Sequence, residues 1–516
     1  MADLGFWKFA AADPSQLALV TPDEKLVSRG ELAAASNRVA RGLQALGLET
    51  GDAVAVVMAN GQPMLELYLA CSQAGFYLVP INHHLAGPEI AYIVENSEAK
   101  AFVAHERFAE TVLAAAKEIP VAASHRFAVG DLEGFRPYGE IAEGQSDEPP
   151  EGRTAGAVMN YTSGTTGRPK GVRRPLAPID PDLVGAMFTG FHQMFGITPE
   201  DGNVHICGSP LYHTAVLMFA GSSLHLGHAV VLMDKWSPEE MLRLIEAHKV
   251  TTSHMVPTQF HRLLQLPDAV RAKYDCSSTR AMVHAAAPCP VEVKQRMLEW
   301  WGDSIWEYYA ATEGGGTIVP PDEWRKKPGT VGRPWVNAEV KIFDDEGNDV
   351  PTGEPGTVYM LRGQADFEYF KDKQKTDKAR LGRYFTVGDI GYLDEDGYLF
   401  LCDRKADMII SGGVNIYPAE IENVLLTHPK IGDVAVFGIP HADWGEEVKA
   451  VVEPIAGEAA GDALTEDILG FCRDKMAKYK TPRSIDYIAE MPRDPNGKLY
   501  KRKLRDPYWE GRDRSI

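Results

Sequence analysis

The chain has 516 residues, of which 44% are hydrophobic and 24% are charged, and its formal net charge is -19. A single core rarely grows past roughly 250–300 residues, so we expect at least two domains, and the composition is that of a globular rather than a disordered protein. Such an acidic chain is a poor partner for nucleic acid, whose phosphates require a basic surface.

The cysteines, the N-terminal stretch and the apolar segments argue against a zinc or redox site, a signal peptide and a membrane span. Six cysteines are scattered without C-x-x-C spacing, which argues against a zinc or redox site and predicts a cytoplasmic, reducing location. The N-terminal stretch MADLGFWKFAAADP lacks the basic start and apolar run of a signal peptide. Glycines and histidines interrupt the most apolar region, 215–233, so it predicts a buried strand or helix pair and no integral membrane segment.

Strand and helix patterns alternate along the first third of the chain. Residues 53–58, AVAVVM, are typical of a short buried strand; a helical stretch follows around 64–71, and then YLVPIN. This rhythm predicts parallel α/β layers. Residues 157–161 predict another strand. The alternation of strand and helix patterns returns after residue 228. Pro238 lies there in the first turn of a predicted helix.

The pattern changes beyond about Lys341. Turn signals at 344–347, 354–356 and 394–397 separate short strands, as in a small antiparallel barrel or sheet. A strand at 408–410, a glycine pair and a helix beginning at Pro418 then predict a small α+β domain. We therefore expect a large N-terminal domain, residues 1–402, of layered α/β subdomains plus a small antiparallel barrel, followed by a small mobile α+β domain, residues 403–516.

A stretch rich in glycine and small hydroxyl residues, NYTSGTTGRPKGV, occupies residues 160–172. Backbone amides of a tight glycine-rich loop hold phosphate oxygens, hydroxyls add donors, and a lysine adds a point charge. The spacing is not the G-x-x-x-x-G-K-[ST] of a P-loop kinase or GTPase. The alternative is a flexible surface linker. The phosphate-binding candidates are Thr162, Ser163, Gly164, Thr165, Thr166, Gly167 and Lys170.

The segment YTSGTTGRPKGV resembles the phosphate loop of the adenylate-forming superfamily of acyl-CoA synthetases, luciferases and adenylation domains. EYYAATEGG, residues 307–315, resembles the Y-G-x-T-E motif of that family. By this match Tyr309 stacks on adenine, and Thr312 lies by the α-phosphate. Glu313, together with Thr165, holds Mg2+, for which a carboxylate is a suitable ligand. Ala310 replaces the usual glycine, so its methyl group is expected to narrow the floor of the acyl pocket.

Two later segments resemble further motifs of the same family. In YFTVGDIGYLDEDGYLFLCDRKADMIISGG, Asp389 matches the aspartate that accepts hydrogen bonds from the ribose hydroxyls, and Arg404 matches an arginine that also reaches the ribose. In PRDPNGKLYKRKLR, Lys498 matches the catalytic lysine, whose charge stabilises the transition state at the α-phosphate. A solvated basic tail is the alternative for that run.

Two shorter motifs complete the resemblance, which runs from about Ser28 to Arg505. Residues 285–288 resemble the G-G-A-P wall of the adenine pocket, with Ala286 and Ala287 as contacts. PLYHTA resembles the P-L-x-H segment, which places His213 at the carboxylate end of the acyl pocket. The alternative is that His213 has no role in binding and is an ordinary histidine of the core or the surface.

The resemblance implies a reaction in two halves. A carboxylate attacks ATP and gives acyl-AMP and pyrophosphate, and a thiol then displaces AMP. The small domain is expected to rotate between the halves and to replace the Lys498 loop with a second loop beside the thiol tunnel. That second loop comprises Ser411, Gly412 and Gly413. The hinge is expected at 403–406, where DRKAD departs from the usual D-R-x-K-D.

The sequence thus predicts an AMP-forming acyl-CoA synthetase that uses ATP, Mg2+ and coenzyme A on a medium- or long-chain carboxylic acid. ISGGVNIYPAEIE looks most like the fatty acyl-CoA ligases. The pair Arg173-Arg174 is unusual for that group and leaves open bulkier steroid, bile-acid or aromatic acids. Two further classes stay open: an enzyme that loads a carrier protein, and a non-catalytic nucleotide-binding protein. The sequence also allows a homodimer.

Overall fold

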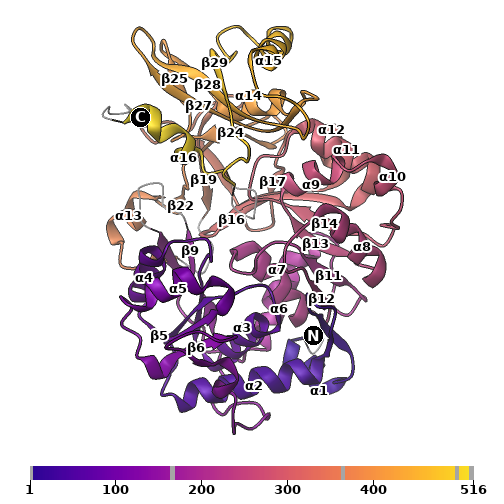
Figure 1. Cartoon of the computed structure of the whole chain (residues 1–516), viewed down its shortest axis with the longest axis vertical. Helices are drawn as coiled ribbons and strands as arrows, with labels where there is room; N and C mark the ends of the chain where they lie inside the picture. Colours follow the sequence, from indigo (N-terminus) through magenta and orange to yellow (C-terminus); the bar gives the residue numbers. More distant parts are fainter. Residues whose placement is uncertain (1–3, 163–168, 362–366, 494–498, 511–516) are drawn as a thin grey trace. The chain divides into compact units, whose positions relative to one another are not determined.

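The computed structural model describes residues 4–162, 169–361, 367–493 and 499–510 (Figure 1). The chain forms two compact units. The first comprises Met1–Met255, Leu266–Val283 and Gly363–Lys378, and the second comprises Val256–Gln265, His284–Arg362 and Ala379–Ile516.

The first unit contains a parallel sheet with the strand order β7-β6-β5-β3-β4-β8. All five residues of β3 are buried, as its continuous apolar run predicts for a strand covered on both faces. The prediction of parallel α/β layers is therefore confirmed. The strands are β3 (Ala53–Val57), β4 (Tyr77–Pro80), β5 (Ala99–His105), β6 (Arg126–Val129), β7 (Arg136–Pro137) and β8 (Ala157–Val158). The helices between them are α3 (Gln62–Ala74), α4 (Gly87–Asn96) and α5 (Ala109–Ala116).

In the second sheet, the strands of this unit have the order β14-β13-β11-β12-β1-β2. Helix α2 begins with a capping box, in which Ser28 and Glu31 satisfy each other's backbone amides. The apolar region 215–233 contains most of helix α7 and strand β12. The strands are β1 (Leu17–Val20), β2 (Leu26–Ser28), β11 (Val204–Cys207), β12 (Ala229–Leu232), β13 (Thr252–Met255) and β14 (Ala281–His284). The helices are α1 (Phe6–Ala12), α2 (Arg29–Ala45), α6 (Leu183–Gln193), α7 (Thr214–His225), α8 (Pro238–His248) and α10 (Asp268–Arg271).

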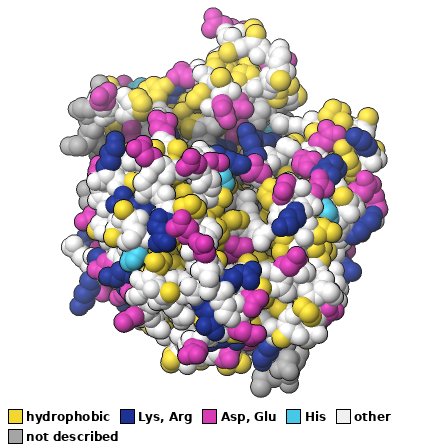
Figure 2. All heavy atoms as spheres, turned by 60° about the horizontal axis from the view of Figure 1, so that its bottom comes forward, with side chains coloured by type: hydrophobic (Ala, Val, Ile, Leu, Met, Phe, Trp, Pro, Cys, Tyr) yellow, Lys and Arg dark blue, Asp and Glu magenta, His cyan; other side chains and the backbone are white. Residues whose placement is uncertain are grey.

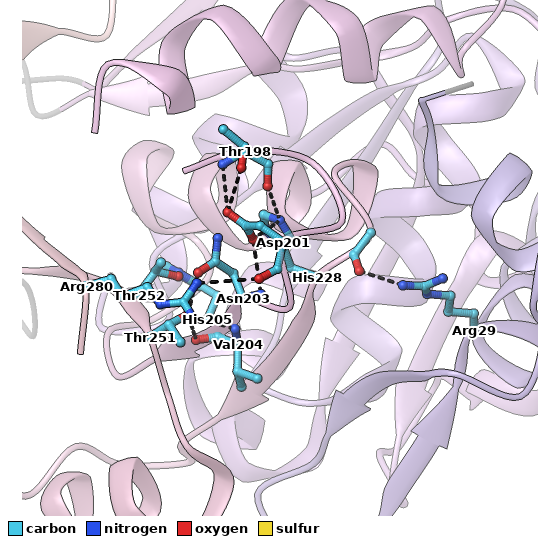
Figure 3. A network of polar contacts seen from close by, with 11 residues as sticks. Arg29, Thr198, Asp201, Asn203, Val204, His205, His228, Thr251, Thr252 and Arg280 are labelled. Atoms are coloured by element: carbon cyan, nitrogen blue, oxygen red, sulfur yellow. Dashed lines mark hydrogen bonds and ion pairs between the residues drawn. The ribbon is translucent and has the colours of Figure 1, made fainter. Parts of the chain in front are cut away.

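A polar network fastens the loops at the amino ends of β11, β12 and β13 (Figure 3). The Asp201 carboxylate accepts hydrogen bonds from the backbone N–H and the hydroxyl of Thr198, at 3.0 and 2.8 Å. His228 Nε2 lies 3.3 Å from Asp201 Oδ1 and 2.8 Å from the Thr198 carbonyl oxygen. Thr251 donates to Asn203 Oδ1 at 2.8 Å. The network therefore satisfies buried polar groups that would otherwise destabilise the loops.

A small antiparallel sheet holds the ends of the predicted phosphate loop. It contains β9 (Asn160–Thr162), β10 (Lys170–Arg173) and β20 (Glu368–Tyr369). Thr162 lies opposite Lys170 in the β9–β10 register. The single strand predicted at 157–161 is instead divided into β8 and β9. Residues 163–168 lie outside the described residues.

Before its C-terminal part, the second unit contains two groups of antiparallel strands and three helices. One group contains β15 (Ile305–Ala311), β16 (Gly314–Val319) and β17 (Arg333–Pro334). The other has six strands, and this confirms the antiparallel region predicted beyond Lys341. Its strands are β18 (Val340–Phe343), β19 (Gly356–Leu361), β21 (Arg380–Leu381), β22 (Tyr384–Phe385), β23 (Asp389–Leu393) and β24 (Leu399–Arg404). The helices are α9 (Pro257–Leu264), α11 (Val291–Trp301) and α12 (Pro321–Lys326); α13 (Lys373–Lys378) belongs to the first unit.

The C-terminal part of the second unit is a small α+β fold, as predicted. Ile409, Ile421 and Val436 belong to one buried cluster that joins its sheet to its helices. The domain boundary at residue 403 stays a prediction. The strands are β25 (Ile409–Ser411), β26 (Val414–Ile416), β27 (Ile431–His441), β28 (Gly445–Pro454) and β29 (Ser484–Tyr487). The helices are α14 (Pro418–Leu425), α15 (Asp462–Lys475) and α16 (Lys501–Arg505).

The surface carries charges of both signs. Acidic and basic side chains are interspersed over the face shown in Figure 2. Among the described helices, none has both the length and the apolar character needed to cross a bilayer.

Candidate active site

The predicted site residues fall into two groups. Thr162, Lys170 and His213 belong to the first unit, whereas the adenine, ribose and metal candidates and the loop at 411–413 belong to the second. Ser163, Gly164, Thr165, Thr166, Gly167 and Lys498 lie outside the described residues.

The second unit brings together three residues predicted to hold the nucleoside. Asp389 opens β23 and Arg404 ends β24, and the two strands pair so that these residues are directly opposite. Arg404 Nε lies 3.4 Å from Asp389 Oδ1. The Tyr309 hydroxyl donates a hydrogen bond to Asp389 Oδ2 at 2.6 Å. Burial, and then the Asp389 charge, raise the pKa of Tyr309, so its hydroxyl keeps its proton and remains a donor.

Asp389 is 8% exposed, so its carboxylate is a buried acceptor with one cationic and one neutral neighbour. Such an acceptor suits a diol, because both ribose hydroxyls can donate to it. Sequence reasoning assigned Tyr309 to adenine stacking and missed its hydrogen bond to Asp389. The two residues are 80 apart in the chain, and no local spacing reveals their contact.

The turn between β15 and β16 carries Thr312 and Glu313. Glu313 is 7% exposed, so it is buried, whereas a glutamate in a turn is usually solvated. Gly316 follows with φ of 156°, and a Cβ there would lie 2.3 Å from the Tyr309 carbonyl oxygen. Glycine is required at that position because the two backbones approach so closely. The turn therefore holds a buried carboxylate just beyond the strand that carries Tyr309.

The predicted adenine wall contains a left-handed residue. Ala286 has φ of 73°, a conformation that favours glycine over alanine. Alanine stands here where the resembling family has glycine, and the backbone keeps the conformation that glycine adopts without strain. A residue held in such a conformation by its surroundings is typical of ligand-contacting turns.

The first unit positions its own candidates on a hairpin and at a helix start. Lys170 Nζ lies over the Tyr369 ring, 5.6 Å from its centroid. His213 is the N-cap residue of α7, and its ring centroid lies 4.2 Å from that of Tyr212. Because α7 then buries Val216, it begins at a boundary between the core and the surface. His213 therefore lies directly before an apolar helix at this boundary.

The segments expected to act in the second half-reaction also have defined local structure. Gly412 and Gly413 have φ of 59° and 80° and form the tight turn between β25 and β26. Gly412 donates to the Trp444 carbonyl oxygen at 2.9 Å. At the expected hinge, Asp403 Oδ2 accepts from the backbone N–H of Ala419 at 2.8 Å, and Lys405 forms an ion pair with Asp345. Lys405 therefore pairs with a residue of the predicted large domain, residues 1–402.

A buried ion pair lies close in sequence to the nucleoside residues, and sequence reasoning did not single it out. Lys294 on α11 is fully buried, and its Nζ lies 2.5 Å from Oε2 of Glu307 on β15. His284 Nε2 is 3.5 Å from the same oxygen. The only sequence signal is that Lys294 lies on the apolar face of α11 with Met297 and Leu298, where a lysine needs a buried partner. Glu307 precedes Tyr309 by two positions, so this pair anchors the strand that carries the nucleoside contact.

Comparison with known protein families identifies the class of the chain. Residues 6–366 match the AMP-binding enzyme family and residues 420–498 match the AMP-binding enzyme C-terminal domain. The chain therefore belongs to the AMP-binding enzyme family, and its class is that of the adenylate-forming, acid-activating ligases.

Relatives in this family differ in the molecule that accepts the acyl group. The chain is 31% identical to a fatty acid–[acyl-carrier-protein] ligase, ScoC, of Streptomyces coeruleorubidus, over 93% of this chain and 91% of that protein. It is also 31% identical to a feruloyl-CoA synthase of an Amycolatopsis species, over 97% and 98% of the two chains. Among solved structures, o-succinylbenzoate coenzyme A synthetase (MenE) of Bacillus subtilis, in complex with ATP and magnesium ion, is similar with a TM-score of 0.78 and 26% identity, over 97% and 98% of the two chains.

Proposed function

We propose that this protein uses ATP to convert a carboxylic acid into an acyl-adenylate and then transfers the acyl group to the thiol of coenzyme A. The observation that carries the proposal is the Tyr309–Asp389–Arg404 cluster, which presents a buried acceptor for a ribose diol. The match of both family domains in order, together with the similarity to ScoC and the feruloyl-CoA synthase, supports the same function.

The roles of the other predicted residues follow from this assignment. Ala286 and Ala287 form one wall for the adenine, and Thr312 lies by the α-phosphate. Lys170, with the hydroxyls and glycines of residues 162–167, holds the β- and γ-phosphates. Lys498 stabilises the negative charge that develops as the carboxylate oxygen attacks the α-phosphorus and pyrophosphate leaves.

The residues present also fit a magnesium ion. Glu313 supplies a buried carboxylate, and Mg2+ prefers one or two carboxylates together with substrate phosphates rather than a full protein cage. This agrees with the described residues, which contain no group of three or more His, Cys, Asp or Glu side chains that could hold a metal alone. Bound there, Mg2+ neutralises phosphate charge; Glu313 and the hydroxyl of Thr165 are the proposed ligands.

For the acid, we propose a medium- or long-chain aliphatic carboxylate, held with its carboxyl group at His213. The sequence ISGGVNIYPAEIE, which looks most like the fatty acyl-CoA ligases, and the similarity to ScoC, a fatty acid ligase, support this. The second candidate is a bulkier aromatic acid, which the similarity to a feruloyl-CoA synthase favours. A carrier protein is the alternative acceptor, because ScoC acts on one.

We further propose that residues 403–516 act as a lid that presents Lys498 in the first half-reaction and the turn at 411–413 in the second. Ser411, Gly412 and Gly413 would then line the passage of the thiol. The proposed place of action is the cytoplasm, since all six cysteines are free thiols.

The test measures AMP and pyrophosphate release with ATP and Mg2+, across short, medium and long aliphatic acids and ferulate, each with and without coenzyme A. AMP formation that requires coenzyme A and one class of acid supports the proposal and names that class. Acid-dependent pyrophosphate exchange without coenzyme A turnover would instead indicate a carrier protein. If no acid supports either reaction, and Lys498→Ala equals the wild type, the proposed function is wrong.

A further inference from the structure

A pocket of about 370 Å³ lies in the first unit, at the amino ends of β3, β4 and β5. Asp52, Tyr77 and Lys100 line it from these strand ends, and Arg173 lines it from the end of β10. Its volume suits a small metabolite. Because ligands of open α/β sheets usually bind at the carboxyl ends of the strands, a pocket at the amino ends is a separate feature.

Two aromatic rings hold Arg173 in place. Its guanidinium carbon lies 4.5 Å from the centroid of the Tyr77 ring and 4.6 Å from that of the Phe370 ring. Tyr77 is itself fixed, because its hydroxyl donates to the Arg174 carbonyl oxygen at 2.7 Å. Stacking occupies the faces of the guanidinium and leaves its in-plane N–H donors available. A pre-oriented arginine of this kind suits the bidentate binding of a phosphate or carboxylate.

The Arg173 guanidinium has no acceptor within the described part of the protein. Its side-chain contacts there are the two aromatic rings, and neither a carboxylate nor a carbonyl oxygen accepts a hydrogen bond from it. An arginine that lines a pocket without an anionic partner is energetically suited to receive one from a ligand.

Arg173 does not serve the predicted phosphate loop on the same hairpin. Side chains alternate along a strand, so Lys170 and Val172 share one face of β10, and Gly171 and Arg173 share the other. The contacts agree, since Lys170 lies over Tyr369 whereas Arg173 lies over Phe370. The pocket is therefore on the opposite face of the hairpin from Lys170.

The remaining charges of the pocket favour an anion that also carries hydroxyl groups. Glu98 is paired with Lys371 at 3.1 Å, and Asp52 Oδ2 accepts from the backbone N–H of Glu49 at 2.8 Å. Arg173 and Lys100 thus supply two positive charges against the single charge of Asp52, because Lys371 balances Glu98. The two carboxylates still have free lone pairs, which can accept hydrogen bonds from hydroxyls of a ligand.

We propose that this pocket binds a small hydroxylated organic phosphate, such as a sugar phosphate, with the phosphate on Arg173 and Lys100 and the hydroxyls on Asp52 and Glu98. The site is distinct from the nucleotide site and does not depend on the proposed function. It gives Arg173, an arginine that the catalytic assignment leaves without a role, a specific ligand class.

The test is a calorimetric titration with ribose 5-phosphate in the presence of saturating ATP and Mg2+ without acid, so that the nucleotide site is filled. Arg173→Gln is expected to weaken binding about tenfold or more, because it removes a charge-assisted pair of hydrogen bonds. Arg173→Lys should lie between the two, since lysine keeps the charge but loses the planar fork.

The matched control is Lys249→Gln, which makes the same change of charge at an exposed site outside the pocket lining and should leave binding unchanged. Circular dichroism and ATP binding report whether each variant is folded. The proposal is overturned if wild-type protein does not bind ribose 5-phosphate at millimolar concentration. It is also overturned if Arg173→Gln binds as tightly as the wild type.

Discussion

The buried Lys294–Glu307 pair gives the sharpest test of how this protein supports its nucleoside site. Lys294 is fully buried and Glu307 is 5% exposed, and the two charges meet at 2.5 Å. Burial lowers the pKa of Lys294 and raises the pKa of Glu307. Each charge therefore depends on the other, and removing one partner leaves the other buried without compensation.

The cost of each single substitution follows from the protonation that it forces. In Glu307→Gln the isolated Lys294 must lose its proton at pH 7, which costs about 4–5 kcal/mol from an ordinary lysine pKa of about 10.4. In Lys294→Met the isolated Glu307 must gain a proton, which costs about 3–4 kcal/mol from an ordinary pKa of about 4.3.

The two variants should respond to pH in opposite directions. In Lys294→Met the folded-state pKa of Glu307 is raised, so the loss of stability shrinks as the pH falls toward about 4. In Glu307→Gln the folded-state pKa of Lys294 is depressed, so the loss shrinks as the pH rises toward about 10. The double variant, Lys294→Met with Glu307→Gln, should show neither pH dependence. Its loss of unfolding free energy should be smaller than the sum of the losses in the two single variants.

Urea unfolding at several pH values, followed by tryptophan fluorescence, measures these differences. Lys326→Met is the control, because Lys326 and Asp322 form an exposed pair whose loss should cost less than about 0.5 kcal/mol. Single-variant losses of under about 1 kcal/mol, or pH slopes of the same sign in both, would refute the account of a mutually dependent buried pair.

Three further predictions concern other parts of the chain. Asp389→Asn should raise the KM for ATP about tenfold or more in the pyrophosphate-release assay, because the ribose loses a charged acceptor; an unchanged KM would remove Asp389 from the nucleoside site. Ala286→Gly should stabilise the protein by about 0.5–1 kcal/mol in urea unfolding, since it relieves the left-handed alanine at the expense of chain entropy; a loss of stability would contradict this. Burial alone would raise the pKa of Asp201, but hydrogen bonds from His228 and Thr198 hold it well below its usual range, so the stabilisation is present above about pH 4 and is lost as the pH falls further. Asp201→Asn should therefore melt below the wild type at pH 7, and a difference that does not shrink below about pH 4 would exclude the carboxylate as its cause.

The sequence predicted those parts of the fold that depend on local patterns. The continuous apolar run of β3 and the proline at the start of α8 specify their elements through burial and backbone geometry within a few residues. The family resemblance assigned Asp389 and Arg404 to the same ribose, and the structure makes them cross-strand neighbours on β23 and β24. The Tyr309–Asp389 contact joins positions 80 residues apart, and only the tertiary structure brings these together.

The partners of buried charged residues could not be predicted from the sequence for a related reason. Lys294 shares the apolar face of α11, but a lysine on a helix is usually solvated, and its partner Glu307 lies on a different element. Likewise, the ring contacts of Arg173 come from Tyr77 and Phe370, which lie far apart in the chain. A pattern within one segment does not encode such pairings, so the pocket at Arg173 could not be predicted.

Two residues of the basic run near the C-terminus are held by buried ion pairs rather than solvated. Lys501 Nζ lies 2.9 Å from Glu422 Oε1, and Arg505 Nη1 lies 3.3 Å from Asp407 Oδ1, with both basic side chains largely buried. Burial would lower the pKa of Lys501, but the surrounding carboxylates raise it, so its charge persists. A solvated tail would need none of these partners. Arg493, bound by Asp433 at 2.5 Å, pairs with Leu499 across the gap in the described residues, so the chain enters and leaves the segment with Lys498 at neighbouring, anchored points.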